Sequence, residues 1–293
     1  MHSLPPEARG IGEGRDASAL NVPLDYAMLS VIKAHAYGND FLYVRTADVE
    51  SRDLEPVRLA VELCDRHTGV GADGLILFSD TPGGARMRLI NSDGSRAEVS
   101  GNGVRALGAV LARQRALAAG TALTIDTDAG PKRLDLLAVD GKARYEFRAN
   151  MGRPNEIERV ALKVGAETID AIRLDMGNPQ CVIFEPLNAD RLAALGRDLQ
   201  THPAFPDAVN VEIACVESRQ HLRILIWERG AGATLSSGTG SCAAAVAAMT
   251  AGFVDRDVTV EAPGGAQRVS WGEDGVFLTG WAEVLLEGHW TRS

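Results

Sequence analysis

Two short glycine-rich turns carry the residues best placed for chemistry. Each turn is a serine followed by Gly-x-Gly, namely Ser100-Gly101-Asn102-Gly103 and Ser237-Gly238-Thr239-Gly240. Small apolar residues follow both turns, so each is expected to begin a helix whose first backbone N–H groups have no partner within the helix. Such a helix end attracts an anion, and glycine lets a ligand approach the backbone closely. One copy alone is an ordinary helix start, whereas two matched copies favour a ligand site.

The chain repeats its landmarks once. Ser100 and Ser237 lie 137 residues apart, and the pairs Gly38-Asn39 and Gly177-Asn178 lie 139 residues apart. Two landmarks that recur in the same order at nearly the same offset indicate a duplicated domain rather than a solenoid. We therefore expect two similar α/β halves, with a small-molecule site in the cleft between them.

Hydrophobic patterning predicts the same order of elements around both turns. The expected strands are 31–44 with a break at Gly38, 75–78, 87–91, 172–176 and 222–227. The expected helices are 56–67, 192–199 and the two that begin after Ser100 and Ser237. We divide the chain into a loose N-terminal tail (1–27, rich in Gly, Pro and charge), a first domain (28–150 with about 282–293) and a second domain (151–281).

The overall composition is that of a globular protein. Of 293 residues, 45% are hydrophobic and 24% charged, and the net charge of −9 argues against a nucleic acid or an anionic membrane as partner. No apolar run approaches the length of a membrane helix, and the N-terminus lacks the pattern of a signal peptide. The four cysteines are widely spaced with no CxxC pair, which favours reduced thiols in the cytoplasm over disulfides or a zinc site.

Polar residues that could hold an amino-acid head group recur at strand ends and turns. Asparagine offers two donors and an acceptor without charge, and the pair Glu228-Arg229 could take an ammonium and a carboxylate. Each asparagine is also a common turn residue, and Glu228-Arg229 could equally be a surface ion pair. The predicted substrate-binding residues are Asn39, Asn91, Gly101, Asn102, Asn178, Asn210, Glu228, Arg229, Gly238 and Thr239.

Two other enzyme classes fit less well. Both turns match the dinucleotide fingerprint G-x-G-x-x-G/A, but residues 92–99 and 230–236 separate each turn from its preceding strand, and that fingerprint needs a direct connection. A serine hydrolase of the G-x-S-x-G type is disfavoured because the glycines follow each serine rather than flank it. We expect no cofactor and no metal.

Several longer motifs identify a family resemblance. From about Met28 to the C-terminus, the chain resembles the diaminopimelate epimerase family. The motifs that carry the resemblance are Gly38-Asn39-Asp40-Phe41, Cys64 through Gly74, Asn91 through Gly103, Met176 through Pro179, Val209-Asn210, and Glu228 through Gly240.

The resemblance implies two like halves, each wrapping strands around a central helix, and a homodimer. It implies interconversion of LL- and meso-diaminopimelate in lysine and peptidoglycan precursor synthesis, without pyridoxal phosphate or metal. In the family, two cysteines face each other across the substrate α-carbon, where one thiolate removes the proton and the other thiol supplies one to the opposite face. Those two positions are Ser100 and Ser237 in this chain.

The serines are the main departure from the family pattern. A thiol has a pKa of about 8.5 and can ionise at a helix end, whereas a serine hydroxyl is far less acidic and usually needs an adjacent base. Neither motif supplies a His or Lys beside its serine, and Gln180 stands where the family usually has histidine. Cys242 lies five residues past Ser237, about 140° round a helix, so we expect it in the core instead.

Three hypotheses remain open from the sequence. The chain is an epimerase whose serines work with a base from elsewhere in the fold, or whose substrate has a more acidic C–H. Alternatively, it is a relative that binds an amino-acid-like ligand without turnover. An engineered double Cys→Ser epimerase would carry the same serines, but Gln180 favours a natural variant.

Overall fold

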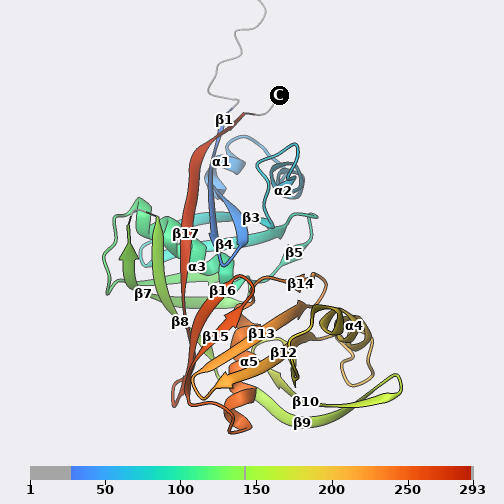
Figure 1. Ribbon diagram of the computed structural model, residues 1–293. Coiled ribbons are helices and arrows are strands. Elements are labelled where there is room, and N and C mark those ends of the chain that lie inside the picture. The colour runs from blue at the N-terminus through green and yellow to red at the C-terminus, as the bar shows by residue number, and fades with distance from the viewer. Residues whose placement is uncertain (1–27, 142, 292–293) are drawn as a thin grey trace, which may run out of the picture.

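Strands dominate the protein, and two buried helices run through it (Figure 1). The computed structural model describes residues 28–141 and 143–291, so the predicted N-terminal tail lies outside the described residues. Across this part of the chain the fold is mixed α/β. No helix among the described residues is long and apolar enough to cross a membrane.

Eight strands form a closed ring around the first buried helix. Each pairs with the next, and the last pairs back with the first. In ring order they are β1 (Met28–Ala36), β2 (Asn39–Arg45), β3 (Gly74–Thr81), β4 (Gly84–Asn91), β6 (Ala122–Thr127), β7 (Gly130–Asp140), β8 (Arg144–Gly152) and β17 (Gly275–Thr291). The short β5 (Arg96–Ala97) pairs with the outer edge of β4.

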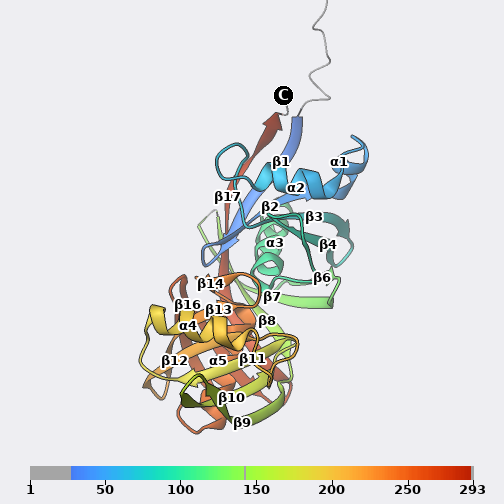
Figure 2. The same cartoon turned by 90° about the vertical axis from the view of Figure 1, so that its right-hand side faces the viewer.

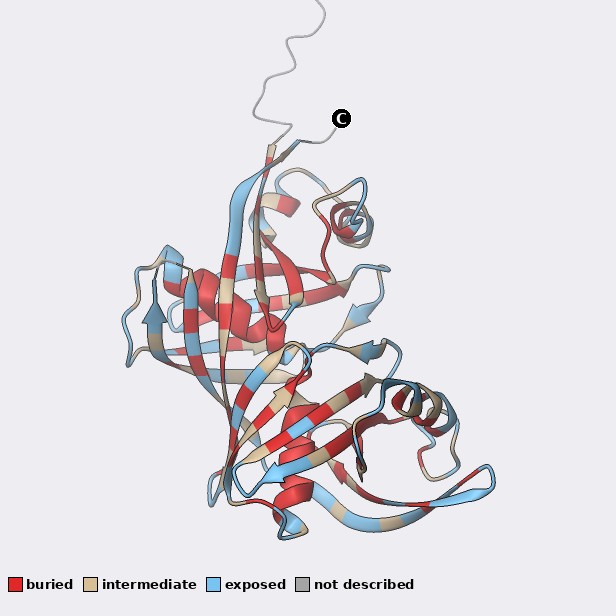
Figure 3. Ribbon diagram, in the orientation of Figure 1, coloured by how far each residue is buried: buried red, intermediate tan, exposed pale blue. Residues whose placement is uncertain are grey.

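The helix inside this ring is α3 (Gly101–Gln114), and every residue from Asn102 to Ala112 is buried (Figure 3). A helix surrounded by strands must be apolar on all sides, which explains its run of Ala, Gly, Val and Leu. Gly108 allows the closest approach, since a Cβ there would lie 2.7 Å from a methyl group of Leu134. The helices α1 (Thr46–Glu50) and α2 (Pro56–Cys64) lie outside the ring.

The second helix, α5 (Gly238–Thr250), has its own set of strands. Pairing runs through β9 (Asn155–Val164), β10 (Glu167–Asp175), β11 (Pro179–Phe184), β12 (Asn210–Ser218), β13 (His221–Glu228), β15 (Asp257–Ala262), β16 (Gly265–Gly272) and then β17. The short β14 (Gly232–Thr234) pairs with β13, and α4 (Ala189–Leu199) covers the outer face of this set. Cys242 is fully buried in the core around α5, as expected.

One long strand belongs to both sets. The first part of β17 pairs with β16 and with β8, and its last part pairs with β1. Figure 2 shows it running between the two bodies of the molecule. The two helix-centred cores are therefore joined by continuous hydrogen bonding.

The elements around the two serine turns were predicted correctly, apart from one boundary. The helix expected over 56–67 ends at Cys64, because the Asp65 carboxylate accepts hydrogen bonds from the backbone N–H groups of His67 and Thr68 and starts a turn there. The strands over 122–164, 179–184, 210–218 and 257–291 and the short helix over 46–50 were not predicted. The domain boundary expected after residue 150 falls within β8 and stays a prediction.

The central position of α3 leads to a stability prediction. Leu107 is fully buried inside the ring, whereas Leu137 on β7 is 43% exposed. Leu107→Ala should reduce the free energy of unfolding by about 2–5 kcal/mol because it leaves a cavity. The control Leu137→Ala should change it by less than about 1 kcal/mol. Urea denaturation measures both, and equal losses would contradict the placement of α3.

Candidate active site

Ser100 and Ser237 occupy equivalent positions at the starts of α3 and α5. Both have extended backbone and act as N-caps. The Ser100 Oγ accepts from the N–H of Gly103 at 3.1 Å, and the Ser237 Oγ accepts from the N–H of Gly240 at 3.2 Å. The two predicted helix starts are therefore present with matched geometry.

The two helix starts also come together. The Asn102 side chain, in the first turn of α3, donates to the backbone carbonyl of Ser236 at 3.4 Å. Arg105, one turn further along, donates to the Asn102 Oδ1 at 3.2 Å. The first turn of one helix thus contacts the residue just before the serine of the other. This arrangement lets two helix dipoles act on one bound group.

Arg105 was not identified from the sequence. It is fully buried, and its guanidinium lies 5.7 Å from the ring centre of Tyr37. Burial lowers the pKa of this guanidinium. The hydrogen bond from the buried Arg105 fixes the orientation of the Asn102 side chain. Arg105 therefore supports the contact of Asn102 with Ser236. In sequence it resembles any arginine in a helix, and only the closed ring makes it a buried one.

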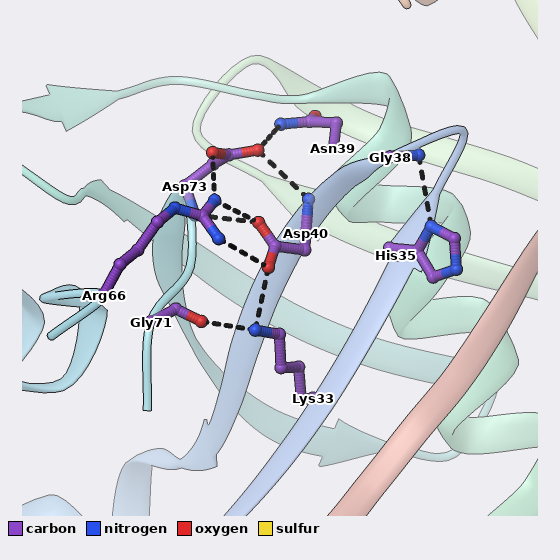
Figure 4. Close-up of polar contacts among 8 residues, drawn as sticks. All are labelled: Lys33, His35, Gly38, Asn39, Asp40, Arg66, Gly71 and Asp73. Atoms are coloured by element: carbon purple, nitrogen blue, oxygen red, sulfur yellow. Dashed lines mark hydrogen bonds and ion pairs between the residues drawn. The ribbon is translucent and has the colours of Figure 1, made fainter. Parts of the chain in front are cut away.

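The start of β2 and the loop before β3 form a charged cluster in the first half (Figure 4). Asp40 pairs with Lys33 at 2.9 Å and with Arg66 at 2.8 Å, and Arg66 also pairs with Asp73 at 2.8 Å. The Asn39 amide donates to Asp73 at 2.7 Å. The hydrogen bond to Asp73 therefore holds the predicted binding residue Asn39 in place. The Asp73 carboxylate itself is half-exposed.

Asn91 ends β4 and stands opposite Gly74 in the ladder between β3 and β4. Its amide donates to the Ser95 Oγ at 2.9 Å, within the turn that follows β4. It is therefore partly engaged as a turn residue, and it lies at the same edge of the ring as the start of β3.

The predicted residues of the second half gather at the matching strand ends. The Asn178 Oδ1 accepts from Gln180 at 2.5 Å, and Asn210 stands opposite Gln180 in the parallel pairing of β11 with β12. The Asn210 side chain donates to the Pro179 carbonyl and accepts from the backbone N–H of Arg229. These bonds bring the ends of β11, β12 and β13 together.

Glu228 and Arg229 do not form an ion pair with each other in the described structure. The Arg229 guanidinium donates to the backbone carbonyl of Asp207, and this side chain is exposed. Glu228 is half-buried, and its pKa is raised by burial first and also by the Asp73 carboxylate. Because Asp73 belongs to the first half, its influence on Glu228 places acidic groups of both halves near each other.

Glu212 is another residue of this region that was not identified from the sequence. Glu212 on β12 is fully buried, and neither carboxyl oxygen has a hydrogen-bond partner among the described residues. Its signal in the sequence is a single charged residue within the apolar strand Val209 to Ala214. A carboxyl group at an inward-facing position of a strand costs free energy unless it is hydrogen-bonded or paired.

The larger of two cavities in the described structure does not have the two serines in its lining. Its volume is about 490 Å³, and it lies between β7 and β8 on one side and β15 to β17 on the other. Tyr37, Gln267 and Trp281 are among its lining residues, whereas Ser100 and Ser237 are not. No group of three potential metal ligands occurs in residues 28–141 and 143–291.

Comparison with known proteins shows what the whole chain is similar to. A family model described as diaminopimelate epimerase matches residues 31–157 and 173–285. A diaminopimelate epimerase of Desulforudis audaxviator is 39% identical over 279 residues, covering 89% of this chain and 99% of the relative. That of Halothermothrix orenii is 36% identical over 279 residues, covering 89% and 97%.

Solved structures with low sequence identity share the fold. A PhzF-family phenazine biosynthesis protein of Bacillus anthracis has a TM-score of 0.67 at 15% identity, covering 90% of this chain and 99% of that one. A hydroxyproline epimerase of Agrobacterium vitis, solved with trans-4-hydroxy-L-proline, has a TM-score of 0.65 at 16% identity, covering 90% and 93%.

The glycines of the two turns should differ in their tolerance of alanine. A Cβ on Gly240 would lie 2.7 Å from the Glu212 Oε1 and 3.2 Å from the Ser237 Cβ, whereas a Cβ on Gly101 meets nothing within 4 Å. Gly240→Ala should destabilise the protein by about 1–3 kcal/mol through overpacking. Gly101→Ala should stay within about 0.5 kcal/mol of the parent. Thermal or urea unfolding distinguishes the two, and a tolerated Gly240→Ala would contradict the tight packing of this turn.

The charged cluster predicts a pH dependence of stability. Burial raises the pKa of Asp40, but hydrogen bonds and charges from Arg66 and Lys33 outweigh it, so the net pKa is lowered. A lowered pKa in the fold stabilises the protein above the unfolded value of about 4, and this contribution is lost as the pH falls further. Asp40→Asn should cost about 1–3 kcal/mol at pH 7, and the difference from the parent should shrink below pH ~4. A pH-independent difference in urea unfolding would contradict the ion pairs.

Proposed function

Because the chain belongs to the diaminopimelate epimerase family of isomerases, we propose that it inverts the α-carbon of an amino acid of the diaminopimelate type, without a cofactor. The observation that carries this proposal is the pair of serine-capped helix starts joined by the hydrogen bond from Asn102 to Ser236. Inversion needs an acid/base group on each face of the carbon, because a single base returns the proton to the side it left. Two equivalent helix ends meet that requirement.

The proposed chemistry is a two-sided proton transfer. The hydroxyl of one serine accepts the α-proton while its own proton passes to a neighbouring base, and the electron pair stays on the α-carbon. The hydroxyl of the other serine then supplies its proton to the opposite face, where the electron pair of the α-carbon forms the new C–H bond, and this hydroxyl takes a proton in turn from a neighbouring acid. The N–H groups at the starts of α3 and α5 stabilise the negative charge that develops on the substrate carboxylate.

The strand ends around the helices supply the binding groups. Glu228 is assigned to the substrate ammonium, and Asp73 adds negative charge from the first half. Asn39, Asn91, Asn178 and Asn210, with Arg229, are assigned to the carboxylates and amines of the substrate. The chain shares its fold with a hydroxyproline epimerase that was solved with a bound amino acid, and this supports a ligand of the same class.

A second candidate is a binding protein of the same family without turnover. The observation in its favour is the pair of serines at the two positions where the resemblance places cysteines, together with Gln180. This candidate shares the binding residues and lacks efficient proton transfer. The two candidates therefore differ only in turnover.

Two finer expectations are part of this proposal. We propose that the protein forms a homodimer and acts in the cytoplasm in lysine and peptidoglycan precursor synthesis, as the family does, and that its two domains meet near residues 150 and 282. Light scattering of the purified protein tests the dimer, and a monomer mass would refute it.

Incubation with LL-diaminopimelate in deuterated water is the decisive test. The epimerase proposal expects α-deuterium in the substrate and appearance of the meso isomer, followed by NMR and chiral chromatography. Hydroxyproline and proline serve as alternative substrates. Binding without α-deuterium or inversion in any of these amino acids would reject the epimerase and favour the binding protein.

Replacing both serines tests the assignment of the two positions. The double variant Ser100→Cys/Ser237→Cys should raise the epimerisation rate by about 100-fold or more, because thiols ionise near neutral pH at a helix start. Each single replacement should give less. No gain in the double variant, with binding intact, would contradict the placement of both residues at the substrate carbon.

A further inference from the structure

The surroundings of the two serines differ at one equivalent position. In the first half, the Cβ position of Gly103 lies 2.9 Å from the Ile76 Cδ1. In the second half, the Cβ position of Gly240 lies 2.7 Å from the Glu212 Oε1. Both glycines hold the same place in their turns, three residues after the serine. The first serine thus has an isoleucine beside its helix start where the second has a carboxylic acid.

The strands explain why these residues correspond. Ile76 is the third residue of β3 and faces the core around α3, while its neighbours Leu75 and Leu77 face α2. Glu212 is the third residue of β12, and Val211 and Ile213 beside it face α4. The alternation of side chains in a strand therefore turns Glu212 toward α5, as it turns Ile76 toward α3.

Glu212 and Ser237 flank the same glycine, Gly240. The Glu212 Oε1 and the Ser237 Oγ both lie within 3.3 Å of the Cβ position of Gly240. The Glu212 carboxyl has no hydrogen-bond partner in the described part of the chain, and it is fully buried. The Ser237 Oγ accepts from the N–H of Gly240 and lies 3.4 Å from the Thr239 Oγ1, where either hydroxyl can be the donor, so the Ser237 proton can turn toward Thr239 or toward Glu212.

We propose that Glu212 is the acid/base partner of Ser237, so that protons enter and leave the second half of the site through a Ser237–Glu212 relay that the first half lacks. This proposal rests on the function proposed above and assigns unequal roles to the two serines. Glu212 acts through Ser237 and does not itself touch the substrate.

The relay balances in both directions. To protonate the substrate, the Glu212 O–H bond breaks and its proton passes to the Ser237 Oγ. The Ser237 proton passes to the α-carbon, whose electron pair forms the new C–H bond, and Glu212 is left as a carboxylate. Abstraction is the reverse, and no free alkoxide is formed at Ser237 in either direction.

The charges around Glu212 favour this use. Burial raises the pKa of Glu212 well above its ordinary value, and Glu228 on the neighbouring β13 raises it further. Cys181 on β11 is the other titratable group beside it, and burial raises the pKa of that thiol as well. A buried carboxyl whose pKa is raised can hold a proton and pass it to a neighbouring group.

The first arm of the test measures turnover. Glu212→Gln keeps the size and removes the proton, so it should lower kcat by about 100-fold with little change in KM and should remove one limb of the pH profile. Glu212→Asp should restore part of the rate. Glu228→Gln should raise KM instead, and Gln267→Met, which removes another buried polar group of the same core, should leave the pH profile unchanged.

The second arm needs no turnover. A thiol is introduced by Ser237→Cys, and its ionisation is followed by the difference in ultraviolet thiolate absorbance from the parent protein. Adding Glu212→Gln should lower the midpoint of that ionisation by about one pH unit, because a neighbouring carboxylate disfavours the thiolate. The same addition to Ser100→Cys, beside Ile76, should leave the midpoint unchanged.

The outcomes separate the two proposals. If the midpoint at position 237 does not move, or moves equally at position 100, the pairing of Glu212 with Ser237 is refuted whether or not the protein turns over. If wild-type activity exists and Glu212→Gln retains it with the same pH profile, the relay is refuted. If the midpoint moves but no amino acid is exchanged or inverted, the proposed function fails while the pairing stands.

Discussion

The enclosure of α3 and α5 by strands is the constraint on which the rest of the molecule depends. A helix buried on all sides has to be built from small apolar residues, and its unpaired N–H groups cannot end in an apolar core. Ser100 and Ser237 satisfy one N–H each as caps. The same burial that stabilises each helix therefore creates a polar, electropositive end. Placing the two ends against each other through Asn102 joins the structural requirement to a binding function.

Much of this arrangement could be predicted because it is local. The serine turns, the asparagines at strand ends and the buried Cys242 follow from spacing and periodicity within a few residues. The strands over 122–164 and 257–291 were missed, because their pairing partners lie far away in the chain. Glu212 and Arg105 were missed for a related reason, since a charged residue is expected at the surface until the packing of strands and helices shows that it is buried. The larger cavity also lies elsewhere than the predicted cleft between the serines.

In the proposed reaction, a serine rather than a cysteine at both helix starts changes what the neighbouring residues must supply. A thiol can carry negative charge by itself when a helix dipole assists it, whereas a hydroxyl has to pass its proton onward in the same step. A second residue behind the serine therefore has to accept and return the proton. The two halves differ at this second residue, which is Glu212 in one half and Ile76 in the other. A duplicated fold thus does not require duplicated chemistry.

The shared strand β17 has a consequence for how the chain is made. It contributes the last hydrogen bonds to the ring of eight strands, so this ring stays open between β1 and β8 until β17 has left the ribosome. During synthesis β1 and β8 then present unpaired edges, which are sites of mispairing with other chains. Ring closure brings together segments more than 200 residues apart, a non-local step of the kind that slows folding. Because β17 belongs to both sets of strands, neither set is complete before β17 has been made.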